Sequence, residues 1–383
     1  MAISLGEVQA LLTDLVSLNT TNPPRDPPPD SQPVERPAVD LLASLCEREG
    51  LPWRRQPAGM GHENLITWLD GEADSPALLL EGHLDVVPAE DWADRAFSPR
   101  VEDGWLCGRG ACDAKASVTG MLLAMFDLAR EGIRPPRPVI FLGAADEERG
   151  GGGAKQFVRT APEVEAAVVG EPTGLIPVVA HKGGIRWEIT FLGRSAHSSV
   201  PEHGVNAIRE AMRAIAALEA LEGHFRATTS HEMLTGPTIT PTMIRGGRAH
   251  NVIPDECAVW IDVRTVPGLP EQEAKDRVIE ALETMGVEAR HGPVLVSTPP
   301  LDTNPQEPIS QACLAACKKA GTADRFGTLT GGTDAPIFAA AGWPSIVLGP
   351  GDLHRAHAVD EKVSLEEVLK ASGVYRDVIL NSR

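Results

Sequence analysis

The sequence predicts an α/β fold in which a mostly parallel, doubly wound sheet is interrupted by a smaller α+β insert. Over residues 1–176, short apolar segments alternate with amphipathic helical segments, which is typical of parallel strands joined by helices. Over 177–295, apolar and polar residues alternate as in antiparallel strands with one exposed face. The first pattern returns over 296–383, so we expect two domains, one of them built from both ends of the chain.

The first part of the chain begins with an amphipathic helix. Its opening segment, MAISLGEVQALLTDLVSLNTTNPP, has Glu7 and Asp14 within an apolar stretch and no basic leader, so it does not resemble a signal peptide. The proline-rich segment 22–37 is expected to be a loop. The next elements are a helix over 38–50, strands in NLITWL and PALLL, a hairpin in VEDGWLCGRGACDA, a helix in KASVTGMLLAMFDLAREG, a strand in RPVIFLGAA, a helix from GGGAKQFVRTAP and a strand in VEAAVVG.

The same patterns predict the helices and strands of the insert and of the last part of the chain. Period-two alternation predicts strands in IRWEITFLG, TITPTMIRGG and CAVWIDVRT, with helices in GVNAIREAMRAIAALEALEG and PEQEAKDRVIEALETMG. The last part is predicted to contain a helix in EPISQACLAACKKAG, a strand in PSIVLG and a helix in SLEEVLKASGVYRDVIL.

Composition excludes some classes of partner. The formal net charge of -18 argues against binding to nucleic acid or to an anionic membrane, and it weakly favours cationic substrates. No apolar run reaches the roughly 18 residues of a membrane-spanning helix. The six cysteines include no C-x-x-C pair, which is typical of reduced thiols, so we expect a cytoplasmic protein.

Histidine and acidic residues follow successive predicted strands. In EGHLDVVP, His83 and Asp85 stand two residues apart at the end of a strand, where they would share one face. Any one of these residues could be a helix cap or a solvated charge, but the carboxyl ends of parallel strands meet at one edge of a sheet. The others are Asp113 in a turn before a helix, Asp146, Glu147 and Glu148 after VIFLGAA, Glu171 after AAVVG, and His357 after SIVLG.

This set of donors favours a pair of transition-metal ions. Carboxylates gathered in one cleft repel each other unless cations neutralise them, and imidazoles with carboxylates suit zinc better than magnesium or calcium. Two ions about 3.5–4 Å apart can hold a hydroxide between them and polarise a carbonyl, which predicts amide hydrolysis. Glu147 and Glu148 are adjacent and point apart, so we expect one to be a ligand and the other a proton shuttle.

The motifs together resemble the dinuclear zinc amidohydrolase family of aminoacylases, carboxypeptidase G, succinyl-diaminopimelate desuccinylase and acetylornithine deacetylase. They are EGHLDVVP, GRGACDAK, AADEERGG, VVGEPTG, GRSAHSSVPEHGVNAI, NVIPDECAVWIDVR and GPGDLHRAHAVDE. The resemblance implies a zinc-exopeptidase-like catalytic domain over 1–176 and 296–383, with a lid and dimerisation domain over 177–295. It also implies two divalent ions, zinc or else cobalt.

The resemblance also assigns roles to individual residues. It implies that His83 and Glu171 bind one metal, that Glu148 and His357 bind the other, and that Asp113 bridges them. Asp85 would orient His83, and Glu147 would be the general base. His357 is preferred over His354 because it stands in the family's H-x-x-D-E context.

In the insert, His197 of SAHSS would reach the site of a partner subunit and stabilise an oxyanion, although it could instead be an exposed turn histidine. Asn251 and Arg264 would hold the substrate, with a structural ion pair of Arg264 as the alternative. Gly332 and Thr333 in GGTDAPIF would line the pocket.

The function implied is hydrolysis of the amide bond of an N-acyl-L-amino acid by a metal-bridged hydroxide and a glutamate base. The acetylornithine deacetylase branch, and with it arginine biosynthesis, is the nearest in resemblance. Desuccinylase, acetylcitrulline deacetylase and dipeptidase activities are alternatives, and a non-catalytic metal- or ligand-binding protein is an alternative of another class. We expect a homodimer acting on a small molecule, with no nucleic acid or membrane partner.

Overall fold

The computed structural model describes residues 3–22, 32–59, 61–89 and 92–382. Most of the proline-rich segment that the sequence analysis treats as a loop, residues 23–31, lies outside the described residues. The chain forms two compact units. Unit 1 comprises Met1–Val179, Thr303–Gly327 and Thr333–Arg383, and unit 2 comprises Ala180–Asp302 and Thr328–Gly332. Compared with the range 177–295 that the sequence analysis assigned to the insert, unit 2 begins at residue 180, ends at residue 302 and also includes residues 328–332.

Unit 1 is built on a mostly parallel sheet, which confirms the predicted α/β class. Its strands lie in the order β1-β2-β6-β3-β7-β15-β8. Neighbours among β6, β3, β7 and β15 run parallel, whereas β1, β2 and β8 run antiparallel to the strands beside them. The strands are β1 Trp53–Pro57, β2 Glu63–Leu69, β3 Ala77–His83, β6 Val139–Ala144, β7 Val164–Val169, β15 Ser345–Val347 and β8 Val178–His181, the last of which crosses the unit boundary.

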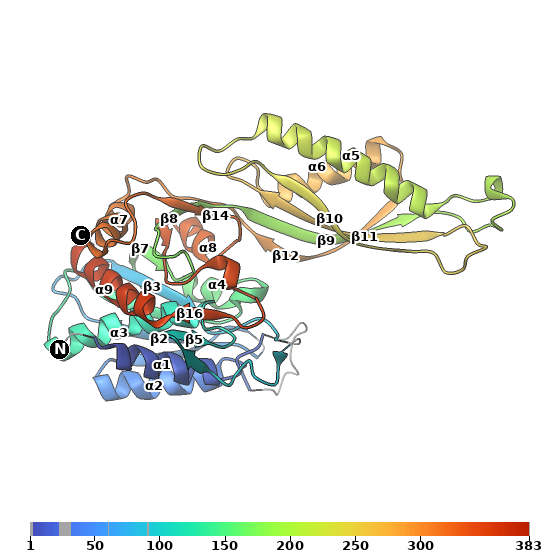
Figure 1. The fold of residues 1–383 in the computed structure, drawn as a ribbon. Coiled ribbons are helices and arrows are strands. Elements are labelled where there is room, and N and C mark those ends of the chain that lie inside the picture. The colour runs from blue at the N-terminus through green and yellow to red at the C-terminus, as the bar shows by residue number, and fades with distance from the viewer. Residues whose placement is uncertain (1–2, 23–31, 60, 90–91, 383) are drawn as a thin grey trace. The chain divides into compact units, whose positions relative to one another are not determined.

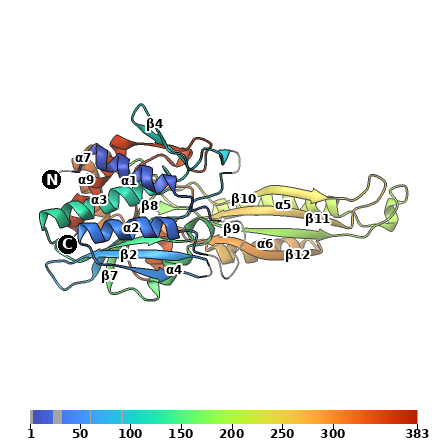
Figure 2. The same ribbon diagram turned by 90° about the horizontal axis from the view of Figure 1, so that it is seen from below.

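Helices cover both faces of this sheet. On one face α3 packs against β3 and β6, and α1, α2 and α9 contact α3, as Figures 1 and 2 show. A Cβ on Gly82 of β3 would lie 2.9 Å from the Val118 side chain of α3, so the alternate residues Glu81 and His83 point to the opposite face. The helices of unit 1 are α1 Leu5–Ser17, α2 Arg36–Glu49, α3 Lys115–Glu131, α4 Gly152–Val158, α7 Pro308–Ala320, α8 Ala335–Ala340 and α9 Leu365–Asn381.

Local sequence signals explain where these helices begin and end. Helix α1 starts with a capping box in which the Ser4 hydroxyl accepts from the Glu7 N–H and the Glu7 carboxylate accepts from the Ser4 N–H. Helix α3 ends at Gly132, whose φ of 66° is a left-handed conformation that glycine adopts at low cost. The helix in GGGAKQFV follows a glycine turn, as predicted, with Gly151 at φ 68° before α4.

A small three-stranded sheet joins distant parts of unit 1. Its strands are β4 Arg100–Glu102, β5 Trp105–Cys107 and β16 Lys362–Ser364, in the order β16-β5-β4. The β4–β5 hairpin was predicted from the sequence, whereas its pairing with β16 was not. This pairing brings the segment that follows His357 next to the segment that precedes Asp113.

Unit 2 has a four-stranded antiparallel sheet in the order β10-β11-β9-β12, with α5 and α6 side by side on one face (Figure 1). Alternate residues of β9, namely Ile185, Trp187, Ile189 and Phe191, are buried in the core under these helices, as the period-two pattern predicted. Its elements are β9 Gly183–Leu192, α5 Ala207–Thr228, β10 Thr238–Gly246, β11 Glu256–Thr265, α6 Glu271–Thr284 and β12 Ala289–Thr298.

Several elements were not predicted. Strand β12 is an edge strand that contains Gly292 and Pro293, and its register with β9 shifts at this place, so no clean alternation marks it. Strand β1 is also an edge strand, and three of its five residues are polar. The other unpredicted elements are β8, α8, β16, β13 Leu301–Asp302, β14 Gly327–Leu329 and the 3-10 helices Glu147–Arg149 (η2), Pro201–His203 (η3) and Leu353–Arg355 (η4). No helix within the described residues is long and apolar enough to cross a membrane.

Candidate metal centre

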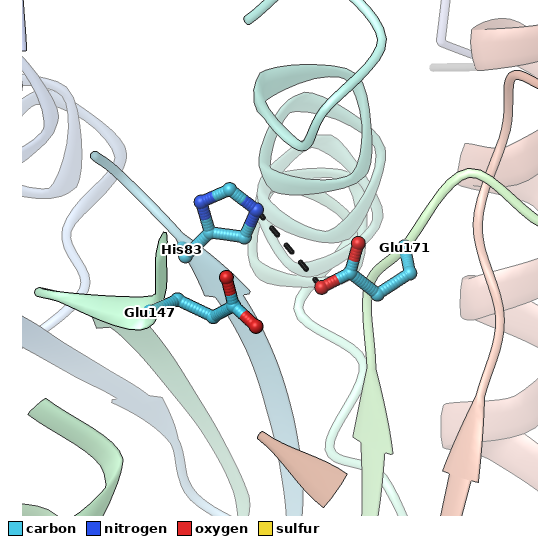
Figure 3. A group of neighbouring side chains, drawn as sticks. All are labelled: His83, Glu147 and Glu171. Atoms are coloured by element: carbon cyan, nitrogen blue, oxygen red, sulfur yellow. Dashed lines mark ion pairs between the residues drawn. The ribbon is translucent and has the colours of Figure 1, made fainter. Parts of the chain in front are cut away.

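Acidic and histidine side chains gather at the carboxyl edge of the parallel sheet. His83 is the last residue of β3, Glu147 and Glu148 lie in η2 just after β6, and Glu171 follows β7. Because β6, β3 and β7 are parallel neighbours, these three strands end at the same edge. Figure 3 shows the carboxylates of Glu147 and Glu171 directed towards the imidazole of His83.

Two overlapping groups of donors could each hold a metal ion. In the first, ligand atoms of His83, Glu147 and Glu171 lie within 4.8 Å of one another, with His83 Nε2 3.9 Å from Glu171 Oε1. In the second, His83, Asp113 and Glu148 meet the same limit. These are the metal-site candidates among the described residues, and both contain His83.

Asp113 lies between two imidazoles. Its Oδ1 is 3.1 Å from His83 Nε2, and its Oδ2 is 3.2 Å from His357 Nε2. His357 Nε2 is also 3.2 Å from Glu148 Oε2. Each oxygen of Asp113 therefore faces a different histidine, and each histidine has a further carboxylate beside it. This is the arrangement in which one carboxylate could bridge two ions.

Asp85 holds the site mainly through contacts that the sequence did not reveal. The main-chain oxygen of Asp85, 2.9 Å away, accepts the hydrogen bond from His83 Nδ1, whereas its carboxylate is 3.8 Å from that nitrogen. The carboxylate instead accepts from the main-chain N–H of Glu147 at 3.1 Å and of Glu148 at 3.2 Å, and from Asn22 Nδ2 at 2.8 Å. Asp85 is fully buried and therefore fixes the turn that carries both glutamates.

We expect Asp85→Asn to lower either kcat or metal affinity by about 10–100-fold, the usual effect of changing a residue that orients ligands. Asparagine keeps the shape but offers only one side-chain oxygen, so at least one of the three donors loses its acceptor. Steady-state kinetics and zinc titration would measure this, with Asp14→Asn on the exposed face of α1 as the matched control. Wild-type values of both quantities would mean that the turn holds its shape without the Asp85 carboxylate.

Burial and neighbouring charges shift the pKa values of the residues in this cluster. Burial raises the pKa of Glu147 and Glu171 well above the ordinary value, and it also raises the pKa of Glu148. Burial by itself lowers the pKa of His83, but the hydrogen bond to Asp113 and nearby carboxylates raise it well above normal. Hydrogen bonds to Asp113 and Glu148 raise the pKa of His357 to about 10. Protons therefore balance the carboxylates in the absence of cations.

Divalent cations fit this donor set. A bound cation supplies the positive charge that the protonated imidazoles otherwise provide, so binding would release protons from them. Imidazole nitrogens mixed with carboxylate oxygens suit zinc and related transition ions. Thiolate ligands play no part among the described residues, because all six cysteines are free and buried and none belongs to either donor group.

The predicted substrate-binding residues lie partly in unit 2 and partly in unit 1. His197 is exposed, and its Nδ1 is 2.7 Å from Ser199 Oγ. Asn251 is exposed as well. Arg264 donates to Asp262, with Nε 2.8 Å from Oδ1. This is the structural ion pair that the sequence analysis gave as the alternative to substrate binding.

At the start of α8, Thr333 is buried in unit 1 and its hydroxyl accepts from the Ala335 N–H. Gly332 belongs to unit 2, where a Cβ on it would lie 2.6 Å from Thr298 Cγ2. His354, the histidine not preferred in the sequence analysis, is exposed in η4.

Some residues around the cluster escaped the sequence analysis. Glu81 is buried on the same face of β3 as His83, and burial raises its pKa well above normal. Burial also raises the pKa of Asp334 to about 7. Glu81 could have been found by its position, because it lies two residues before His83 in an otherwise apolar strand. Asn22 has no such local signal, whereas Arg109 and Glu361 stand in the motifs GRGACDAK and GPGDLHRAHAVDE, which did not show what these two side chains do.

The chain resembles known proteins along nearly its whole length. Residues 79–381 match the family model described as Peptidase family M20/M25/M40. An acetylornithine deacetylase of Myxococcus xanthus is 33% identical, over 98% of this chain and 97% of that protein. One of Salmonella typhimurium is 34% identical, over 84% of this chain and 85% of that protein.

Solved structures share the fold at lower identity. A tripeptidase of Staphylococcus aureus superposes with a TM-score of 0.81 at 21% identity, covering 99% of both chains. A Bacillus subtilis protein, described as a dinuclear metal-binding peptidase of the M20 family, has a TM-score of 0.70 at 16% identity over 98% of this chain and 97% of that one.

Proposed function

The chain belongs to the peptidase family M20/M25/M40 and is a hydrolytic enzyme, and we propose that it uses two divalent metal ions to hydrolyse the amide bond of an N-acyl-L-amino acid. The observation that carries this proposal is the position of Asp113 between His83 and His357. Each histidine has its own carboxylate neighbour, Glu171 or Glu148, so the donors divide into two sets that share one residue.

The proposed mechanism gives each residue a distinct task. His83 and Glu171 would hold one ion, His357 and Glu148 the other, and Asp113 both. When bound, two such ions lower the pKa of a water molecule towards about 7 and polarise an amide carbonyl. Glu147 would take the proton from the attacking water and deliver it to the departing amine, because its main chain is fixed by Asp85 and its carboxylate faces the cluster. Zinc suits these donors, and cobalt would be accepted as well.

N-acetyl-L-ornithine is the substrate that we propose. Curated relatives that are 32–34% identical carry the name acetylornithine deacetylase, and the formal net charge of -18 favours a cationic side chain. The peptidases among the solved structures are at most 21% identical, so their likeness concerns the fold alone. Release of ornithine would place the enzyme in arginine biosynthesis, and the free buried thiols are compatible with the cytoplasm that this pathway implies.

A substrate panel tests this assignment. Zinc-loaded protein would be assayed with N-acetyl-L-ornithine, N-acetyl-L-citrulline, N-succinyl-diaminopimelate, dipeptides and tripeptides. We expect the highest kcat/KM for acetylornithine, by at least about tenfold, because a wrong side chain leaves polar groups of the pocket unpaired. A preference for a peptide or a succinyl substrate would contradict the proposed substrate, but it would still agree with the assignment as a hydrolase. No turnover of any substrate by fully loaded protein would favour the non-catalytic alternative.

Metal removal should abolish turnover reversibly. Dialysis against a chelator is expected to reduce the rate to background, and added zinc or cobalt should restore it, because the cluster has no other source of a Lewis acid. The measurement is activity against metal content, with chelator already saturated with zinc as the control. Full activity of metal-free protein would exclude the proposed mechanism.

The proposal includes a homodimer formed through unit 2. Apolar side chains stand exposed on both edge strands of its sheet, at Met243 (55%) and Ile244 (54%) on β10 and at Leu295 (61%) on β12. In such a dimer His197 could serve the site of the partner subunit. Light scattering on the purified protein should give the mass of two chains, and Ile244→Asp should shift it towards one. A monomeric wild type would contradict this part.

A further inference from the structure

Arg109 and Glu361 form a buried ion pair between two loops that carry candidate ligands. Arg109 Nη1 lies 2.7 Å from Glu361 Oε2, and the two residues are only 3% and 1% exposed. Arg109 stands four residues before Asp113, and Glu361 stands four residues after His357. Neither residue is among the predicted ligands. Because the two residues are far apart in the sequence, their ion pair could not be predicted from it.

Glu361 fixes the main chain that leads into Asp113. Its Oε1 accepts from the N–H of Cys112 at 2.8 Å and of Asp113 at 2.9 Å, and its Oε2 accepts from the N–H of Gly110 at 3.1 Å. With Arg109, four N–H donors surround one carboxylate. Such charge-assisted hydrogen bonds to main-chain donors are strong and directional, so Glu361 sets the position of the Asp113 backbone.

Arg109 extends the same contact to the loop of His357. Its Nη2 donates to the carbonyl oxygen of His357 at 3.4 Å, and its Nη1 donates to that of Ala358 at 3.4 Å. Nη2 also donates at 3.4 Å to the carbonyl oxygen of Pro88, in the loop that follows β3. The guanidinium carbon lies 5.3 Å from the centre of the Trp92 ring, a cation–π contact that favours this position of the side chain.

His357 needs such support because its backbone is in the left-handed region, with φ 59°. This conformation is unfavourable for a residue with a side chain and persists when surrounding contacts fix it. The planar fork of arginine can reach several carbonyl oxygens in fixed directions, whereas a lysine ammonium cannot reproduce that geometry.

We propose that Arg109 and Glu361 are positioning residues that set the distance between Asp113 and His357 and thereby create the second of the two metal sites. Asp113 Oδ2 and His357 Nε2 are 3.2 Å apart, and they belong to loops whose backbones this ion pair joins. The ion held by His83 and Glu171 shares Asp113, but its other two ligands follow strands β3 and β7, so we expect it to be less affected. The inference rests on the proposed dinuclear function.

Zinc titration of Arg109→Lys and Glu361→Gln tests the proposal. Wild-type protein should bind two ions per chain. Both variants should keep the tighter ion, lose affinity for the weaker one by about 10–100-fold, and regain kcat when excess zinc is added. In a His357→Ala background, Arg109→Lys should have little further effect on zinc binding, because Arg109 acts mainly on the site that His357 completes.

Arg376→Lys is the matched control, because Arg376 also pairs with a buried acid, Asp127 at 2.9 Å, but between α9 and α3. It should lower thermal stability at most and leave both zinc affinities unchanged. Arg109→Lys is the milder variant and decides the question if Glu361→Gln does not fold. Two ions bound with wild-type affinities in Arg109→Lys would overturn the inference. A wild type that binds fewer than two ions would instead contradict the proposed function, and the inference with it.

Discussion

Replacing Glu147 with alanine is expected to lower kcat by about 10²–10⁴-fold, the usual contribution of a general acid–base group, while two metal ions stay bound. Glu147 is held in place through its main-chain N–H, which donates to Asp85, so its carboxylate is free for chemistry. Burial raises the pKa of this carboxyl well above normal in the metal-free protein. Bound cations would offset part of this rise, because a nearby positive charge favours the carboxylate form.

The metal content of Glu147→Ala decides between two roles. The carboxylate of Glu147 also lies within reach of His83 and Glu171, so the geometry alone permits it to be a ligand. Two ions per chain with little turnover would support the role of base. One ion per chain would make Glu147 a ligand and overturn the assignment. Glu165→Ala, on the same sheet but with an exposed side chain, is the control and should match the wild type in both measurements.

Asp113→Ala should have the largest effect on metal binding. Its two oxygens face His83 and His357, so its removal takes one ligand from each ion at once. We expect fewer than two ions per chain and a loss in kcat of about 10³-fold or more, because metal activation contributes several kcal/mol and each 1.36 kcal/mol is tenfold in rate. Metal analysis after dialysis and steady-state kinetics would measure both effects.

Two further variants make the Asp113 result specific. Asp113→Asn keeps the volume and a single oxygen, so it should retain more metal than Asp113→Ala but stay nearly inactive. Asp14→Ala removes an exposed carboxylate from α1 and should leave both quantities unchanged. If Asp113→Ala retained two ions with wild-type affinity, Asp113 would not be the bridge, and the two-metal arrangement would need another shared ligand.

The sequence predicted the parts of the fold that depend on local patterns. The apolar runs of β3, β6 and β7, the caps of α1 and α3 and the period-two strands of unit 2 are all marked within short windows. The candidate site was accessible by the same route, because its acids follow apolar strands and parallel strands end at one edge. Strand ends thus predicted that His83, Asp113, Glu148, Glu171 and His357 lie close together, whereas the choice of Glu148 over Glu147 as a ligand came from the family resemblance.

Contacts between residues far apart in the chain could not be predicted from local sequence patterns. The pairing of β16 with β5, the contact of Asn22 with Asp85 and the ion pair of Arg109 with Glu361 join residues far apart in the chain. The unpredicted strands β1 and β12 are edge strands, where polar or bulged segments pair because a neighbouring strand offers a free edge. The pattern of residues within one segment does not show which strand will lie beside it.

The amino-acid sequence by itself determined the α/β class and most helices and strands, and it predicted that acids and histidines gather at one edge of the sheet, because period, caps and strand ends are properties of neighbouring residues. Only the tertiary structure decided how the Asp85 carboxylate is used, which residues fix the ligand loops, and that Arg264 pairs with Asp262. These depend on directions and distances between segments that meet only after folding, since a buried polar group takes whichever partner the packing brings to it.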